Sequence, residues 1–267
     1  MTGAVVVASN SWIYLSSHPT NGGSVLLHMG SLRVLTPGAG ISAENGGYVG
    51  GYYAWPVVHD GFGPGGGANG PYGGAPGGGG GHGGAGGTYN GYGSAAGGPS
   101  YDSTNAPLAP GSGGGNYGGQ PLRVGGTGGG AVRIVADGSV VLKGSITADG
   151  QIGHTDGSDG CGAGGSIFIR CLEFDGLSGT ILARGGSKAE DAGGGGGRIA
   201  LWIGDIGPAD ETNIINNISK HFVFTNNPAG YLQSASVDGG IGEYSGSPGT
   251  MFFAEKLPPA GTVISIR

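Results

Sequence analysis

Three stretches decide the fold of this chain: Gly-Gly-Ser-Ile-Phe-Ile at residues 164–169, Gly-Thr-Ile-Leu-Ala-Arg-Gly-Gly at 179–186, and Gly-Gly-Gly-Gly-Gly-Arg-Ile-Ala-Leu at 193–201. Each joins a short apolar run to a row of glycines. Several such runs in the chain alternate apolar with small or polar residues, the period-2 pattern of a half-buried strand. These stretches therefore predict short strands bounded by glycine-rich segments.

The same unit recurs along the chain. Its opening strand follows Gly130, Gly165 and Gly197, at intervals of 35 and 32 residues. Short strands of this kind cannot bury their apolar faces alone, but stacked rungs can, as in solenoid proteins. Further opening strands lie at 23–27, 249–253 and 261–265, a middle strand lies at 140–142, and closing strands lie at 41–47, 146–150 and 181–186.

The repeat predicts an all-β fold, a glycine-rich parallel β-helix-like solenoid. The alternative is an antiparallel β-sandwich with long glycine loops. We expect a single elongated β domain over 1–267, with an insertion at 61–122 and a short helical or irregular excursion at 205–228. Pro208, Asp210 and Glu211 favour a helix start there, and an apolar helix face follows at Ile214, Ile215, Ile218 and Phe222.

Glycine accounts for 69 of the 267 residues, and the 61–122 insertion holds 27 of them with seven prolines and one charged residue, Asp102. A flexible linker is one interpretation of such a composition. The other is an ordered, polyglycine-II-like arrangement of extended threads with three residues per turn, packed side by side. Only glycine allows backbones to approach so closely, and the runs at 77–81 and 83–84 favour the ordered threads.

The charge balance excludes some partners. A net charge of -6 with only 11 Lys and Arg argues against binding to nucleic acid or to an anionic membrane. We expect no membrane span, because no apolar run approaches the ~20 residues of a transmembrane helix. No basic region precedes the short apolar run Val5–Val7, so no signal peptide is visible.

The repeat units resemble the glycine-rich repeats of large bacterial and protist cell-surface and extracellular proteins, described as β-helix or adhesin-like. Ser-Pro-Gly-Thr-Met-Phe-Phe at 247–253 is similar to a strand that commonly closes such repeats. The resemblance covers residues 20–50 and 125–255, and it implies an extracellular or cell-surface, elongated, structural or adhesive protein with no catalytic residues to carry over. By composition, 61–122 resembles the polyglycine bundles of some phage tail-tip adhesins and extracellular filament subunits.

Polysaccharide lyases and pectin-degrading hydrolases use the parallel β-helix, so an enzyme has to be considered. Such sites need converging carboxylates with a Lys or Arg that stabilises a developing anion. We expect the candidate residues to be outward positions on strands and turns, and the chain not to be an enzyme. The candidates are Asp137, Asp149, Lys143, Arg133, Arg170 and Glu173.

Metal and disulfide chemistry have few candidates. Residues 154–159 alternate Asp and Ser oxygens with Gly, which makes Asp156 and Asp159 candidates for calcium, but the EF-hand spacing and its closing Glu are absent. We therefore expect no cofactor. Cys161 and Cys171 either form a disulfide that closes a small loop or remain two thiols, and two cysteines do not decide between them.

Tyrosine is concentrated near the insertion, with eight of the eleven between residues 48 and 117. Aromatic rings on a nearly uncharged surface suit sugar stacking or subunit contacts. Alternatively, these rings cover the glycine threads. The candidate binding residues are Tyr48, Tyr52, Tyr53, Trp55, Tyr72, Tyr89 and Tyr92.

These features predict a structural subunit of an extracellular assembly, such as a filament, sheath or surface layer. The partner would be another copy of the chain, because the apolar strands Val5–Val7 and 263–266 lie at the two ends and favour head-to-tail association. Alternatively, both strands pair within the body of the chain. The second functional hypothesis is an adhesin or glycan-binding module that uses the tyrosine-rich glycine tract.

Overall fold

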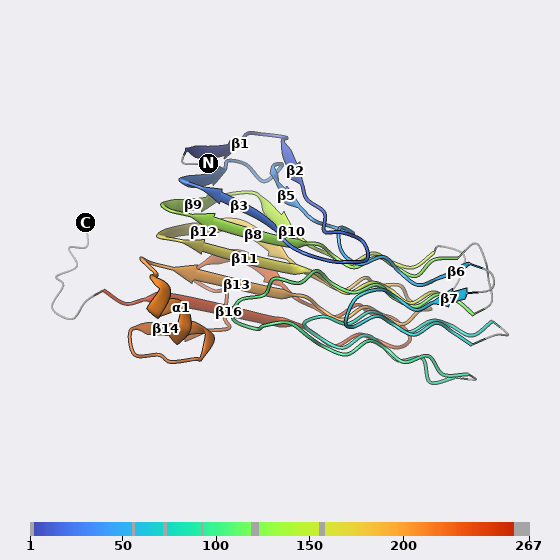
Figure 1. Cartoon of the computed structure of the whole chain (residues 1–267). Coiled ribbons are helices and arrows are strands. Elements are labelled where there is room, and N and C mark those ends of the chain that lie inside the picture. The colour runs from blue at the N-terminus through green and yellow to red at the C-terminus, as the bar shows by residue number, and fades with distance from the viewer. Residues whose placement is uncertain are drawn as a thin grey trace.

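The computed structural model describes residues 3–54, 57–71, 74–91, 93–118, 123–154 and 158–258. The protein is nearly all β, with 3% helix and 34% strand, and none of the sheets in the described residues is closed. Figure 1 shows the sheets gathered in one half of the molecule. Glycine-rich segments run out of this half side by side to the far end, where β6 (Tyr52–Ala54) and β7 (Val57–His59) form a hairpin.

The larger sheet has eight strands in two arms that share β12 (Glu173–Leu182). In the first arm, β1 (Ala4–Val7), β4 (Ser31–Val34) and β9 (Ser139–Leu142) lead to the start of β12. In the second arm, β2 (Trp12–Tyr14), β5 (Gly40–Ser42) and β10 (Ser145–Thr147) lead to the end of β12, which also pairs with β15 (Leu232–Ser236).

The second sheet has six strands. Five of them are parallel neighbours: β3 (Val25–Met29), β8 (Ala131–Ala136), β11 (Ser166–Cys171), β13 (Arg198–Ile203) and β16 (Thr250–Lys256). The sixth, β14 (Phe222–Thr225), is antiparallel to β16. Because the paired strands in both sheets are otherwise parallel, the antiparallel sandwich alternative is wrong.

The chain visits the strands in a repeating order: one strand of the six-stranded sheet, then one of the first arm, then one of the second arm. β8, β9 and β10 form one such pass, and β11 with the two parts of β12 forms the next. Parallel register places apolar residues of successive passes side by side, and the fully buried Ile41, Ile146 and Ile181 form one such ladder. Stacking of these ladders makes the core.

The predicted helix is present but short. α1 (Pro208–Ile215) begins after Gly207, whose amide donates to Asp210 Oδ2 at 3.1 Å, and Pro208 occupies its first turn. The predicted apolar face is wrong in part, because α1 ends before Ile218 and only Ile214 is buried in it, while Ile215 and Ile218 are about half exposed. Phe222 belongs to β14, where it packs against the outer face of the six-stranded sheet.

The glycine-rich segments form a bundle held by backbone hydrogen bonds. We call these segments threads and the whole the glycine bundle. The insertion is part of it, since Gly80 donates to the Cys161 carbonyl and Gly115 to the Gly78 carbonyl. The threads are residues 43–51, 60–70, 75–87, 95–99, 109–118, 124–130, 148–153, 159–165, 183–187, 191–197 and 237–249.

Thread 159–165 lies at the centre of the glycine bundle, with backbone hydrogen bonds to six other threads. Its backbone amides donate hydrogen bonds to three neighbouring threads in rotation, so that residues three apart donate to the same thread. Gly160 and Ala163 donate to thread 109–118, Cys161 and Gly164 to thread 191–197, and Gly162 and Gly165 to thread 148–153. Its carbonyls accept from threads 75–87, 124–130 and 183–187. A β-strand has neighbours on only two sides, so this thread follows a three-residue period instead of a two-residue one.

Gly162 provides a test of this packing. A Cβ atom on Gly162 would lie 2.1 Å from the Thr127 carbonyl oxygen, whereas a Cβ on Gly3 would meet nothing within 4 Å. Gly162→Ala should therefore lower the free energy of unfolding by about 3 kcal/mol or more, or prevent folding, because backbone must move. Gly3→Ala is the control. Equal urea midpoints for the two variants would contradict the close packing.

Candidate functional site

An aromatic cluster lies at the far end of the glycine bundle. The ring of Tyr52, on β6, lies 4.7 Å from that of His59, on β7, and 6.1 Å from that of Phe62. His59 and Phe62 are 5.9 Å apart. We call these three residues the tip cluster. Tyr53 lies on the same hairpin, which Figure 1 places remote from the sheets.

Two other predicted tyrosines, Tyr48 and Tyr89, have contacts elsewhere in the structure. Tyr48 is only 9% exposed, so its prediction as a binding residue is wrong. Its ring fills the space beside Gly22 and Gly63, where a Cβ would lie 2.2 and 2.5 Å from tyrosine atoms. Tyr89 packs edge-on against Tyr244 at 5.3 Å. Trp55, Tyr72 and Tyr92 lie outside the described residues.

The two cysteines are both free and buried, so the disulfide alternative is wrong. Cys161 lies in a thread and Cys171 ends β11, at opposite ends of an extended segment. A disulfide requires the two Cα atoms to approach within about 7 Å, and an extended strand rises about 3.3 Å per residue. Burial raises the thiol pKa of Cys161 to about 11 and that of Cys171 to about 12.

The calcium candidates do not form a site in the described residues. Asp156 lies outside them. Asp159 is fully buried, and its Oδ1 accepts from the Tyr117 amide at 2.6 Å. Across the described ranges, no group of three or more His, Cys, Asp or Glu is arranged to hold a metal ion. The same ranges contain no helix long and apolar enough to cross a membrane.

Two buried carboxylates face adjacent threads in the glycine bundle. Asp159 and Asp191 are both fully buried, and Lys188 Nζ lies 3.0 Å from Asp191 Oδ2. Asp159 Oδ2 and Asp191 Oδ1 have no hydrogen-bond partner among the described residues, and Asp191 Oδ2 is paired with Lys188. Burial raises the pKa of both carboxyl groups, and that of Asp191 to about 6. The negative charges of Asp159 and Glu190 also raise the pKa of Asp191, whereas Lys188 lowers it.

The six candidate catalytic residues are dispersed among separate interactions. Asp137 pairs with His28 at 2.9 Å, Asp149 pairs with Arg184 at 2.6 Å, and Arg170 pairs with Glu211. Asp137 and Arg170 do line one open hollow of about 320 Å³ beside Cys171. Lys143 and Glu173 are exposed, and Arg133 lines a different hollow with Arg170.

A serine, a histidine and an aspartate meet where the glycine bundle joins the six-stranded sheet, a grouping that sequence spacing did not reveal. Ser166 Oγ lies 3.4 Å from His82 Nε2, which lies 3.5 Å from Asp102 Oδ2. Ser166 and His82 are fully buried, and the Ser166 hydroxyl donates to the Ala109 carbonyl at 2.6 Å. Burial opposes ionisation of Asp102, but hydrogen bonds from His82 and three backbone amides outweigh it and lower the pKa.

This grouping differs from a nucleophilic triad in geometry. A triad serine gives its proton to the histidine, and its oxygen is open to substrate. Here the hydroxyl proton is directed to a backbone carbonyl, and the Leu108 and Ala109 amides occupy Asp102 Oδ2 at 2.8 Å each. The three side chains therefore anchor the 101–109 loop to the sheet.

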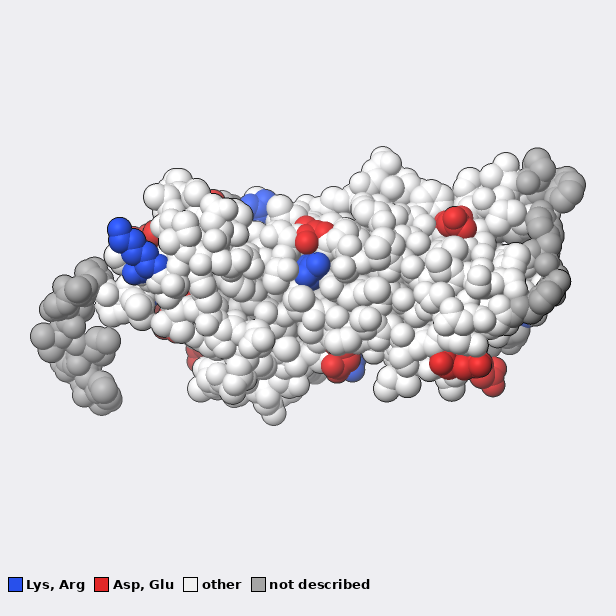
Figure 2. Space-filling view, turned by 90° about the horizontal axis from the view of Figure 1, so that it is seen from below, with Lys and Arg blue, Asp and Glu red and all other residues white. Residues whose placement is uncertain are grey.

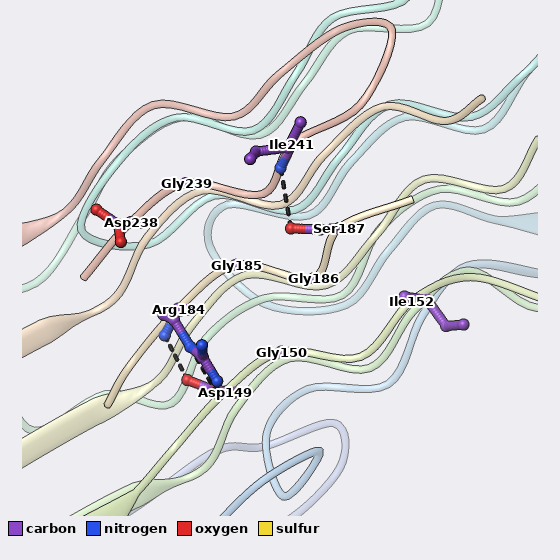
Figure 3. Close-up of a pocket in the computed structure, with 10 residues that line it drawn as sticks. All are labelled: Asp149, Gly150, Ile152, Arg184, Gly185, Gly186, Ser187, Asp238, Gly239 and Ile241. Carbon is purple, nitrogen blue, oxygen red and sulfur yellow. Dashed lines mark hydrogen bonds and ion pairs between the residues drawn. The ribbon is translucent and has the colours of Figure 1, made fainter. Parts of the chain in front are cut away.

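A groove of about 400 Å³ lies where threads 148–153, 183–187 and 237–249 leave the sheets (Figure 3). Arg184 bends onto Asp149, with Nε and one terminal nitrogen 3.0 and 2.6 Å from Asp149 Oδ2, and this hydrogen bonding raises the pKa of Arg184. Ile152 and Ile241 are 40% and 75% exposed beside it. The groove thus combines hydrogen-bonding groups with exposed apolar side chains.

Comparison with known proteins gives no assignment: no family model matches the chain, and neither a curated protein nor a solved structure matches it.

The buried pair predicts the pH dependence of stability. The folded-state pKa of Asp191, about 6, lies above its unfolded value of 3.8, so the native state binds more protons between these values. Its contribution to stability is thus present below about pH 4 and lost as the pH rises through 6. Asp191→Asn should raise the free energy of unfolding at pH 7.5 by up to about 3 kcal/mol and flatten its pH profile.

The comparison variant is Glu190→Gln, which removes a charge from the exposed neighbouring residue; because that charge is only a minor cause of the raised Asp191 pKa, it should change the profile much less than Asp191→Asn. Urea unfolding from pH 4 to pH 8 measures both variants. A wild-type profile that gains stability as the pH rises from 5 to 7, or equal profiles for Asp191→Asn and wild type, would contradict the burial argument.

Proposed function

We propose that this protein is a non-catalytic structural subunit of an extracellular assembly such as a filament, sheath or surface layer. Its body would be a β-solenoid, and the glycine bundle would be a polyglycine-II-like extension of its coils. The repeating order of strands in the two sheets supports the solenoid, since each pass through the three rows of strands corresponds to one coil.

The hydrogen bonding of thread 159–165 carries the proposal. Backbone bonds to six neighbours in a three-residue period fit polyglycine II, in which each chain bonds to its whole surroundings. Such a bundle is held together by backbone hydrogen bonds, and it contains few side chains that could take part in catalysis. A rigid body of this kind suits mechanical support.

The surface and the buried polar groups fit the same role. Figure 2 shows charged side chains as isolated spots on an elongated body, in keeping with a chain that is only 10% charged. The Ser166, His82 and Asp102 grouping lies in the interior, where it joins loop, thread and sheet. The extracellular or cell-surface location is proposed from the resemblance of the repeats.

The assembly proposal predicts that the purified chain forms polymers. At concentrations of tens of micromolar and above, negative-stain electron microscopy should show filaments or sheets, and light scattering should show mass that grows with concentration. Ionic strength should have little effect, because so few charges are present. A monodisperse monomer at all concentrations would contradict the proposal.

Adhesion is the second candidate function, and the tip cluster favours it. Tyr52, His59 and Phe62 lie together at the far end of the glycine bundle. If the sheets are attached to a surface, this end is the part of the molecule that a ligand reaches first. Stacked and tilted aromatic rings with few charges nearby are suited to the apolar faces of sugars. A glycan is therefore the ligand class proposed for this end.

The adhesin alternative predicts that the double variant Tyr52→Ala, Phe62→Ala loses at least tenfold in affinity for any glycan that the wild-type chain binds on an array. Tyr14→Ala is the control, since Tyr14 is 77% exposed on β2, in the opposite half of the molecule. A blank array for the wild type, or equal binding by the double variant and the control, would exclude the tip cluster as a glycan site.

A further inference from the structure

Within the described part of the chain, the apolar core is uncovered at the end formed by β1, β2 and β3. There each of these strands pairs along only one edge, with β4, β5 and β8 respectively. Their inward residues Val5, Ile13 and Leu27 are only partly buried, whereas Val7 and Met29, at the ends of β1 and β3, are buried. The residues paired with them in the next pass, Leu32, Ile41 and Ile134, are fully buried. We call β1, β2 and β3 the open end.

The opposite end of the same ladder is covered. Leu27 begins a ladder that continues through the six-stranded sheet to Phe253, which is 1% exposed. Tyr231 stacks on Phe253 at 5.4 Å, nearly parallel, and β14 occupies the outer edge of β16. The described residues therefore seal the core at one end and leave it open at the other.

The open end also lacks the devices that protect strand edges. Soluble proteins place Lys, Pro, charges or bulges on such edges to prevent pairing with other chains. β1, β2 and β3 read Ala-Val-Val-Val, Trp-Ile-Tyr and Val-Leu-Leu-His-Met, with no Lys, Arg, Asp, Glu or Pro. Two such ends can approach each other without charge repulsion.

We propose that two copies of this chain bind head to head through their open ends. The contact covers Val5, Ile13 and Leu27 of both copies, and the free edges of β1, β2 and β3 pair with edges of the second copy in antiparallel fashion. An identical end is the favoured occupant because it supplies the same uncovered core and the same unpaired strand edges. The far end has unpaired edges at β14 and β15, but its core residue Phe253 is covered by Tyr231, so it supplies no uncovered core among the described residues. This inference rests on the proposed self-association and identifies the surface through which two copies bind.

Adjacent residues of β1 give a matched pair of variants. Val5 faces the core at the open end, whereas Val6 is 53% exposed and faces outward beside Arg33. Val5→Lys keeps its charge solvated in a single copy but buries it in the head-to-head pair. Sedimentation velocity should show at least a 100-fold weaker association for Val5→Lys and an unchanged one for Val6→Lys, with circular dichroism confirming that both fold.

Cross-linking establishes the orientation. Ser11→Cys places a thiol beside β2, and Asn227→Cys places one beside β14; both sites are exposed. The native thiols are buried with raised pKa values and should react slowly. With a flexible bis-maleimide, Ser11→Cys alone should form covalent dimers, whereas Asn227→Cys alone should not.

The outcomes separate this inference from the assembly proposal. Covalent dimers that form only when the two cysteine variants are mixed would mean head-to-tail association, and polymers unaffected by Val5→Lys would mean a different contact. Either result overturns the head-to-head pair and leaves assembly standing. A stable dimer without polymers supports the pair and contradicts filament formation. A monomer at all concentrations overturns both.

Discussion

The absence of a Cβ atom is the constraint on which the rest of this structure depends. A thread can bond to neighbours on all sides only if backbones approach more closely than any side chain permits, and glycine alone meets this condition. Along thread 159–165, a Cβ on Gly160 would lie 1.9 Å from the Gly78 carbonyl oxygen and one on Gly165 would lie 1.9 Å from that of Gly130. In the bundle, glycine therefore permits close backbone packing and is not a source of flexibility.

Each sequence repeat contributes to both the sheets and the glycine bundle, but its backbone hydrogen bonds are arranged differently in the two. In the strands, β-branched and aliphatic side chains such as Ile146 and Ile181 stack inward and direct backbone bonds to two neighbours. Where the side chains give way to glycine, the same chain passes from a two-residue to a three-residue period and bonds in all directions. Few side chains enter that interior, so Asp159 and Asp191 are costly there and titrate abnormally.

The proposed functions follow from where side chains remain. At the far end of the glycine bundle, the rings of Tyr52, His59 and Phe62 form a cluster. The sheets leave apolar core uncovered at one end, because no residue described here lies over Val5, Ile13 and Leu27. One feature suits adhesion and the other suits self-association, and a structural surface protein can use both.

The sequence determined the strands and the use of glycine. Short apolar runs that follow glycine, such as 165–169, and the spacing of their copies predicted the strand positions, because a continuous apolar run of this length is typical of a strand buried on both faces. The tertiary structure decided the rest. It buried Tyr48, separated Cys161 from Cys171, joined Ser166 to His82 and Asp102, and uncovered the core at β1, β2 and β3. These contacts join residues whose separation along the chain has no period, so only the path of the threads and the order of the sheets could bring them together.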